Sequence, residues 1–99
     1  MQFLLVAYDA TDDKAPERRL AARGAHLTLL TQNKARGHAR YAAAILDDNG
    51  KMNGSMMVLE YDSREQLDEW LAVEPYVTQE VWKSLQITEC KIAAAFAAS

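Results

Sequence analysis

Residues 38–61 read HARYAAAILDDNGKMNGSMMVLEY, and the fold predicted for the chain depends on this segment. Two apolar runs, 38–46 and 54–61, flank the polar stretch DDNG at 47–50. An Asn-Gly pair between apolar runs is a strong β-hairpin signal, because a tight hairpin turn needs residues that tolerate positive φ. The segment therefore predicts two adjacent antiparallel strands in the middle of the chain.

N-terminal to this hairpin, the pattern predicts a strand over 3–8, a polar loop over 9–14 and a helix from Pro16 to about Arg36. Proline fits the first turn of a helix, and Gly37 fits the position that follows its end. Three leucines cluster on one side of this helix and predict its buried face: Leu20, Leu27 and Leu30.

C-terminal to the hairpin, Ser63 and Gln66 match a capping box at the start of a second helix. That helix is expected to end before Glu74, because the residue preceding a proline resists the helical conformation. A short helical turn from Pro75 to about Val81 and a last strand over 82–91 complete the chain.

The order β-α-β-β-α-β predicts an α+β, ferredoxin-like single domain over 1–99, with a four-stranded antiparallel sheet and both helices on one face. The first three strands carry apolar side chains on both faces, and two helices cover only one. A second copy of the chain would cover the other, so we expect a homodimer packed sheet against sheet. The alternative is that this face binds another protein. A cleft between sheet and helices is the expected small-molecule site.

Composition narrows the possible partners. The chain has 99 residues and a formal charge of −3, which argues against nucleic acid, since phosphate binding needs a basic surface. We expect no membrane insertion, because no apolar run approaches about 20 residues. The single cysteine, Cys90, excludes an internal disulfide and favours a reducing, cytoplasmic setting. The Ala-rich tail at 93–99 is expected to be flexible or to contact another subunit.

His26 is the first candidate for chemistry. It falls at the edge of the apolar side of the first helix, on a strip shared with Arg19 and Arg23. Nearby cations favour a neutral imidazole, which is a competent general base. The alternative is an ordinary half-buried histidine of an amphipathic helix.

Glu74 is the second candidate, because a residue directly before Pro75 is expected to be the N-cap of the following helical turn. Backbone N–H groups there favour the ionised carboxylate, which can orient a histidine; the alternative is a simple cap. His38 could line the same cleft, although a surface position is the more ordinary interpretation. We expect no metal site, since two separated histidines with no HExxH or CxxC motif provide no ligand set.

Three segments resemble the YciI-like family: residues 19–27 (RLAARGAHL), 54–58 (GSMMV) and 74–77 (EPYV). They resemble the family's first-helix histidine motif, its Gly-Ser strand and its Asp-Pro-Tyr motif, in order along the whole chain. The resemblance implies a dimeric α+β barrel and a His–Asp active site. Its histidine corresponds to His26 and its aspartate to Glu74, which is longer by one methylene. Gly24 stands where the family often has proline.

These observations predict a small homodimeric enzyme that uses neither metal nor organic cofactor. His26 is expected to act as general base or acid, oriented by Glu74, while Arg19 or Arg23 holds an anionic substrate and Tyr76 lines the pocket. The expected reaction is proton transfer on a small cyclic or aromatic molecule, an elimination or isomerisation of the lyase or dehydrochlorinase kind. The competing hypothesis is a non-enzymatic accessory dimer that binds a metabolite or a protein.

Overall fold

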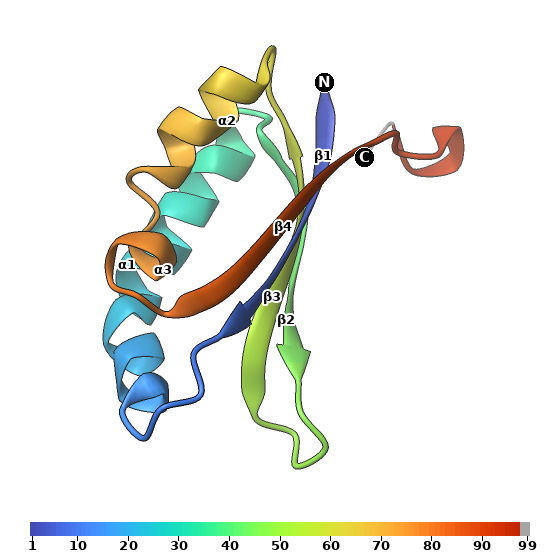
Figure 1. Cartoon of the computed structure of the whole chain (residues 1–99). Coiled ribbons are helices and arrows are strands. Elements are labelled where there is room, and N and C mark those ends of the chain that lie inside the picture. The colour runs from blue at the N-terminus through green and yellow to red at the C-terminus, as the bar shows by residue number, and fades with distance from the viewer. Residues whose placement is uncertain (98–99) are drawn as a thin grey trace.

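The computed structural model describes residues 1–97 and contains one four-stranded sheet with its α-helices on one side (Figure 1). The predicted order of elements is confirmed: β1 (Gln2–Asp9), α1 (Ala15–Ala35), β2 (Ala39–Leu46), β3 (Met52–Glu60), α2 (Arg64–Leu71), α3 (Pro75–Thr78), β4 (Trp82–Cys90) and a short 3-10 helix, η1 (Ala94–Phe96). Of the predicted tail, residues 98–99 lie outside the described part.

The strand order is β2-β3-β1-β4, and every neighbouring pair is antiparallel. Leu5, at the centre of β1, pairs with Met57 on one side and Ile87 on the other, and all three side chains point toward the helices. The core lies between this face and the helices, where α2 contributes the buried Leu67 and Trp70. This is the predicted ferredoxin-like arrangement.

The central hairpin forms as predicted, with β3 beginning at Met52, two residues before the expected start. The Gly50 backbone N–H donates to the Asp47 carbonyl at 3.0 Å, and Gly50 has a φ of 79°. The Asp47 side chain also accepts from the backbone N–H groups of Asn49 and Lys51. A local register shift lets Met52 pair with Leu46, which explains the longer strand.

The capping box at α2 is formed only in part. Ser63 Oγ accepts from the Gln66 backbone N–H at 3.2 Å, as predicted. The Gln66 side chain, however, accepts from the backbone N–H of Asp62 at 3.3 Å, one residue before the expected partner. The cap therefore satisfies one backbone donor that the start of the helix leaves without an intrahelical partner, and it also pairs the N–H of the residue before the cap.

The predicted buried face of α1 was wrong for two of its three leucines, whereas Leu30 is partly buried against the core. Leu20 is 76% exposed and Leu27 is 40% exposed. The buried residues instead follow a helical spacing of three, four and seven along a second stripe: Ala15, Arg19, Ala22, His26 and Asn33. Small alanines allow close packing, while the polar residues on this stripe have partners on β1, directly after β3 and at the N-cap of α3. The leucine pattern gave a wrong prediction because the side of α1 that carries Leu20 and Leu27 is not the side that the helix buries.

Gly54 permits the close approach of β3 to β1. A Cβ atom at this position would lie 2.6 Å from the backbone carbonyl oxygen of Ala7. Backbone must therefore move in a Gly54→Ala variant, and we expect a loss of about 1–3 kcal/mol of unfolding free energy. A Cβ atom added at Gly24, inside α1, would meet no atom within 4 Å, so Gly24→Ala is the matched control and is expected to stabilise by about 0.5–1 kcal/mol. Urea unfolding of both variants tests this, and a neutral Gly54→Ala would contradict it.

An exposed ion pair joins the loop before α1 to α1 itself, and its arginine also contacts the turn after α3. Arg18 donates to both carboxylate oxygens of Asp12, at 2.7 and 2.8 Å, and its Nε donates to the Glu80 carbonyl at 3.1 Å. Hydrogen bonds from Arg18 lower the pKa of Asp12 from 3.8 to about 2. Glu80 has a positive φ of 59°, so this contact supports a turn that non-glycine residues rarely adopt.

The lowered pKa predicts a pH-dependent contribution to stability. Because the folded-state pKa lies below the unfolded value, the contribution is fully present above 3.8 and is lost as pH falls toward about 2. We expect the melting temperature of Asp12→Asn to lie below that of the wild type above this window and to converge with it at the acid end. Thermal melts across this pH range test it, and a constant difference between the two proteins would contradict it.

The second face of the sheet is uncovered. Leu4, Val6, Met56 and Val58 lie at its centre and are half-buried within the single chain, while Tyr8 and Tyr41 are 48% and 65% exposed. The outer strand β4 contributes polar side chains to this face. The C-terminal segment projects beyond the sheet on the side away from the helices (Figure 1). It is held by a hydrogen bond from Arg40 to the Ala97 carbonyl at 2.7 Å.

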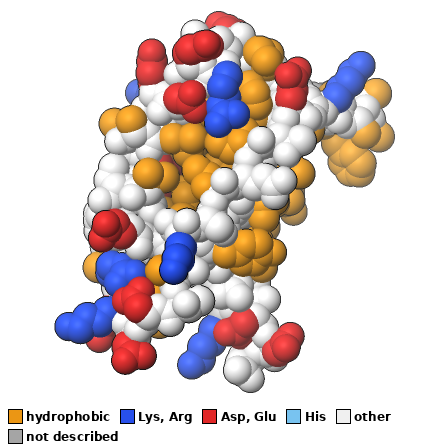
Figure 2. Space-filling view, in the orientation of Figure 1, with side chains coloured by type: hydrophobic (Ala, Val, Ile, Leu, Met, Phe, Trp, Pro, Cys, Tyr) orange, Lys and Arg blue, Asp and Glu red, His pale blue; other side chains and the backbone are white. Residues whose placement is uncertain are grey.

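Apolar surface is also visible along the opening between the helices and β4, and on the C-terminal segment (Figure 2). Leu85 of β4 is 42% exposed and Phe96 is 72% exposed. Within residues 1–97, every helix is too short or too polar to span a lipid bilayer.

Candidate active site

His26 is positioned by the buried stripe of α1. It is only 6% exposed, more buried than the sequence predicted. Arg19 lies seven residues earlier, which is two helical turns, so both side chains project from the same side of α1. Both contact the ring of Tyr76, which comes from α3.

Glu74 lies directly against His26. Its Oε1 atom is 2.5 Å from His26 Nδ1, and the carboxyl group is completely buried. The same oxygen accepts the Tyr76 backbone N–H at 3.1 Å, because Glu74 is the N-cap of α3 with Pro75 at the first helical position. The structure thus brings together two residues that are 48 positions apart in the sequence.

The second carboxylate oxygen of Glu74, Oε2, is buried and has no hydrogen-bond partner within residues 1–97. An ionised carboxylate accepts hydrogen bonds and cannot donate them. With Glu74 ionised, Nδ1 of His26 carries the proton in this contact. The lone pair of the imidazole then resides on Nε2, the nitrogen that a base uses.

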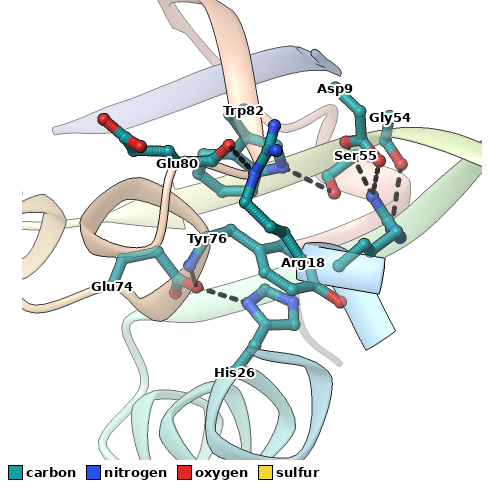
Figure 3. A network of polar contacts seen from close by, with 10 residues as sticks. Asp9, Arg18, His26, Gly54, Ser55, Glu74, Tyr76, Glu80 and Trp82 are labelled. Atoms are coloured by element: carbon teal, nitrogen blue, oxygen red, sulfur yellow. Dashed lines mark hydrogen bonds and ion pairs between the residues drawn. The ribbon is translucent and has the colours of Figure 1, made fainter. Parts of the chain in front are cut away.

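Tyr76 packs flat on His26. The two rings are stacked, with centroids 3.8 Å apart and planes within 9° (Figure 3). Arg19 lies over the Tyr76 ring at 4.8 Å from its centroid. Burial raises the pKa of Tyr76 above its ordinary value, although the nearby Arg19 and Arg23 act in the opposite direction. The hydroxyl therefore stays protonated and can donate a hydrogen bond at neutral pH.

The two arginines of the strip differ in what they contact. Arg19 is buried, and one terminal nitrogen donates to both carboxylate oxygens of Asp9 at 2.8 and 2.9 Å. Its other terminal nitrogen donates to the Gly54 carbonyl at 3.3 Å. Arg23 is exposed and has no ion pair or hydrogen bond within the described chain. Arg23 is therefore the arginine whose charge is free for a ligand.

Ser55 and Trp82 belong to the same cluster and were not among the predicted site residues. Ser55 is 4% exposed on the helix side of β3, and its Oγ accepts a hydrogen bond from Trp82 Nε1 at 3.1 Å (Figure 3). The sequence contained one signal for Ser55: the alternation of the strand places this polar residue on the side that faces the core. Trp82 carries no such signal, because a tryptophan at the start of a strand is ordinarily a core residue.

Several of the site residues line a cleft of about 260 Å³ between α1 and the edge of the sheet formed by β2 and β3. Its polar lining consists of Arg19, Arg23, His26, Ser55 and Tyr76. The remaining walls are apolar: Leu27, Leu30, Ala42, Ala43, Ala44, Met52 and Met57. Ligand pockets ordinarily occupy about 300–1,000 Å³, so this cleft, just below that range, has the size for a molecule built on a single ring.

The other sequence candidates lie elsewhere. His38 stacks on Tyr61 with centroids 4.3 Å apart, and its Nδ1 contacts the Glu60 carbonyl at 2.8 Å, away from the cleft. Cys90 is a free, half-buried thiol at the end of β4. Residues 1–97 contain no group of three or more histidine, cysteine, aspartate or glutamate side chains arranged to hold a metal ion.

Comparison with solved structures shows two informative similarities. The 5-chloro-2-hydroxyhydroquinone dehydrochlorinase from Burkholderia phenoliruptrix AC1100, solved in complex with 2,5-dihydroxybenzoquinone, is 20% identical with a TM-score of 0.80, over 96% of this chain and 98% of that chain. A NIPSNAP domain protein from Burkholderia xenovorans is 23% identical with a TM-score of 0.52, over 95% of this chain and 96% of that chain.

At these identities the similarity establishes the fold. It confirms the predicted fold class, the ferredoxin-like protomer from which dimeric α+β barrels are built. A comparison with curated proteins found no match. The family model of the YCII-related domain matches residues 1–91, which is nearly the whole chain and includes all four strands, α1, α2 and α3. The resemblance predicted from the three sequence segments is confirmed, and the chain belongs to the YCII-related domain family.

Proposed function

We propose that the protein is a small-molecule lyase or isomerase in which His26 transfers a proton to or from a ligand in the cleft. The observation that carries this proposal is the contact of His26 Nδ1 with Glu74 Oε1 at 2.5 Å, beside a cleft lined by Ser55 and Tyr76. A buried carboxylate that accepts the Nδ1 proton fixes the ring orientation and stabilises the imidazolium that forms after proton uptake. His26 is therefore the general base, and Glu74 is its orienting partner.

The lining of the cleft supports a proposal for the class of substrate. Apolar walls of leucine, methionine and alanine suit a flat hydrocarbon ring, while the hydroxyl groups of Ser55 and Tyr76 suit ring oxygens. Arg23 provides a positive charge at the same cleft for an anionic group. We propose a hydroxylated, partly anionic ring compound as the substrate.

The proposed reaction is the elimination of a leaving group from such a ring. In a chlorinated hydroquinone, the keto tautomer carries chlorine on an sp3 ring carbon next to a carbonyl. His26 Nε2 takes the proton of a conjugated ring hydroxyl, the O–H electron pair forms a new carbonyl, the ring double bond shifts, and the C–Cl bond breaks with release of chloride. The net change is loss of HCl, which needs neither an oxidant nor a reductant. The similarity to a dehydrochlorinase supports this choice, and isomerisation of a lactone by proton relocation uses the same base.

We further propose that the working form is a homodimer joined through the uncovered sheet face. Half-buried apolar side chains lie at its centre, and a contiguous apolar surface on a soluble protein marks an interaction site. A second copy offers the same surface, so a two-fold interface buries both at once. The alternative is that this face binds a different protein. The molecular mass of the purified protein in solution distinguishes the two cases, because a homodimer has twice the mass of one chain.

The experiment that tests the proposed activity is a substrate panel. Chlorinated hydroquinones are assayed by chloride release, and lactones by the change in ultraviolet absorbance, with wild-type protein and with His26→Ala. Turnover by the wild type that the variant lacks supports the proposal. Equal turnover by both proteins would exclude a catalytic role for His26, and binding without turnover would favour the accessory-dimer hypothesis.

A further inference from the structure

Trp82 contacts the candidate site without lining the cleft. It is 8% exposed and is the first residue of β4. Its ring stands nearly perpendicular to that of Tyr76, with centroids 5.6 Å apart and planes at 72°, and to that of His26, at 6.3 Å and 78°. Its indole N–H points to Ser55 Oγ at 3.1 Å (Figure 3). Trp82 therefore reaches the cleft through the Ser55 hydroxyl.

This hydrogen bond has a fixed direction. An indole nitrogen is a donor only, whereas a serine hydroxyl has one proton and two lone pairs. Ser55 must therefore use one lone pair to accept from Trp82, and its own proton cannot point that way. Within residues 1–97, the Ser55 hydroxyl donates to no acceptor.

Because Ser55 is buried, the directions in which its hydroxyl proton can donate are limited. Ser55 is 4% exposed, and the cleft is the open space that it lines. If the second lone pair faced the cleft to accept from a ligand, the proton would remain buried without an acceptor, which is unfavourable. Accepting the indole N–H also polarises the O–H bond and makes it a better donor.

We propose that Trp82 is a positioning residue that sets the hydrogen-bond direction of Ser55, so that the cleft selects ligands presenting an acceptor oxygen. A phenolate, enolate or quinone oxygen satisfies the Ser55 proton, whereas an isosteric ring amine presents its own N–H groups to it. This inference rests on the proposed function in one respect only, that the cleft is the ligand site.

The test compares two probes of nearly equal shape, 4-nitrophenol at a pH where it is fully ionised and 4-nitroaniline. Their dissociation constants are measured for the wild type and for Trp82→Phe, which keeps an aromatic ring but has no N–H donor. We expect the wild type to prefer the phenolate and the ratio of the two constants to shrink about fivefold in Trp82→Phe, the size of one net hydrogen bond. A purely structural role of Trp82 would weaken both probes together and leave the ratio unchanged.

Ser55→Ala and the double variant complete the test. In a protein that already carries Ser55→Ala, adding Trp82→Phe is expected to leave the ratio of the two dissociation constants unchanged, because Trp82 acts through the serine. Thr28→Ala removes an exposed hydroxyl of α1 outside the cleft lining and is the matched control. If Trp82→Phe does not fold, the Ser55→Ala variant provides the test. A wild-type ratio of the two dissociation constants in that variant would overturn the inference.

Failure of this inference is distinguishable from failure of the proposed function, because the probes measure binding and not turnover. If Trp82→Phe leaves the ratio of the two dissociation constants unchanged while turnover depends on His26, only the role of Trp82 is refuted. A ratio that depends on Trp82 in a protein without turnover refutes only the enzymatic reaction. No measurable binding of either probe to the wild type would also overturn the inference.

Discussion

Turnover by the His26→Ala variant is expected to fall about 10²- to 10⁴-fold, the contribution that a positioned general base makes to proton transfer. His26 Nδ1 contacts the buried Glu74, so its Nε2 is the basic nitrogen available to a ligand in the cleft. Alanine removes this nitrogen. The measurement is the kcat for the best substrate of the panel, with free imidazole added back to restore part of the rate.

A second variant separates the loss of the base from damage to the fold. His26→Ala leaves the fully buried Glu74 without its partner, and an unpaired buried charge costs about 3–5 kcal/mol. His26→Gln keeps an N–H donor for Glu74 but provides no base. We expect His26→Gln to fold normally and to be as inactive as His26→Ala. Wild-type turnover by a folded His26→Gln protein would refute the assignment of the base.

A lysine in place of Met56 is expected to convert the proposed dimer into a monomer. Met56 lies at the centre of the uncovered sheet face, opposite Val6 in the register. A two-fold interface would bring two such lysines into one apolar contact, and burying an unpaired charge is strongly unfavourable. We expect the dimer dissociation constant to rise at least about 10²-fold, measured by sedimentation velocity over a concentration series.

The control for this variant is Glu65→Lys, an exposed position on α2 on the other side of the molecule. It reverses a charge, yet it is expected to leave the sedimentation coefficient unchanged. Circular dichroism should show the same fold for both variants. A wild-type protein that sediments as a monomer at micromolar concentration would refute the dimer, and a dimeric Met56→Lys would place the interface elsewhere.

Much of the backbone could be predicted because local signals specify it. The DDNG turn at 47–50 produced the central hairpin, with Gly50 in the positive-φ region that glycine favours. Ser63 caps α2, and Glu74 caps α3 immediately before Pro75. Each signal acts over a few residues, so it operates in the same way whatever the rest of the chain does.

The face that α1 buries could not be predicted in this way. Three leucines favoured one side of the helix, but Leu20 is largely exposed and the stripe with Arg19 and His26 is buried. Hydrophobic periodicity assumes that a buried side chain is an apolar one. Here the buried polar groups are compensated by distant partners, Asp9 for Arg19 and Glu74 for His26, and those pairings are not visible in the helix itself.

The sequence by itself therefore determined the order of the elements, their caps and turns, and an apolar second face of the sheet. His26 and Glu74 were each identifiable, and the family resemblance paired them. Only the tertiary structure decided their 2.5 Å contact, the engagement of Arg19 with Asp9, and the hydrogen bond from Trp82 to Ser55. The physical reason is that caps and turns are satisfied by neighbouring residues, whereas a buried polar group needs a partner that the packing of separate elements supplies.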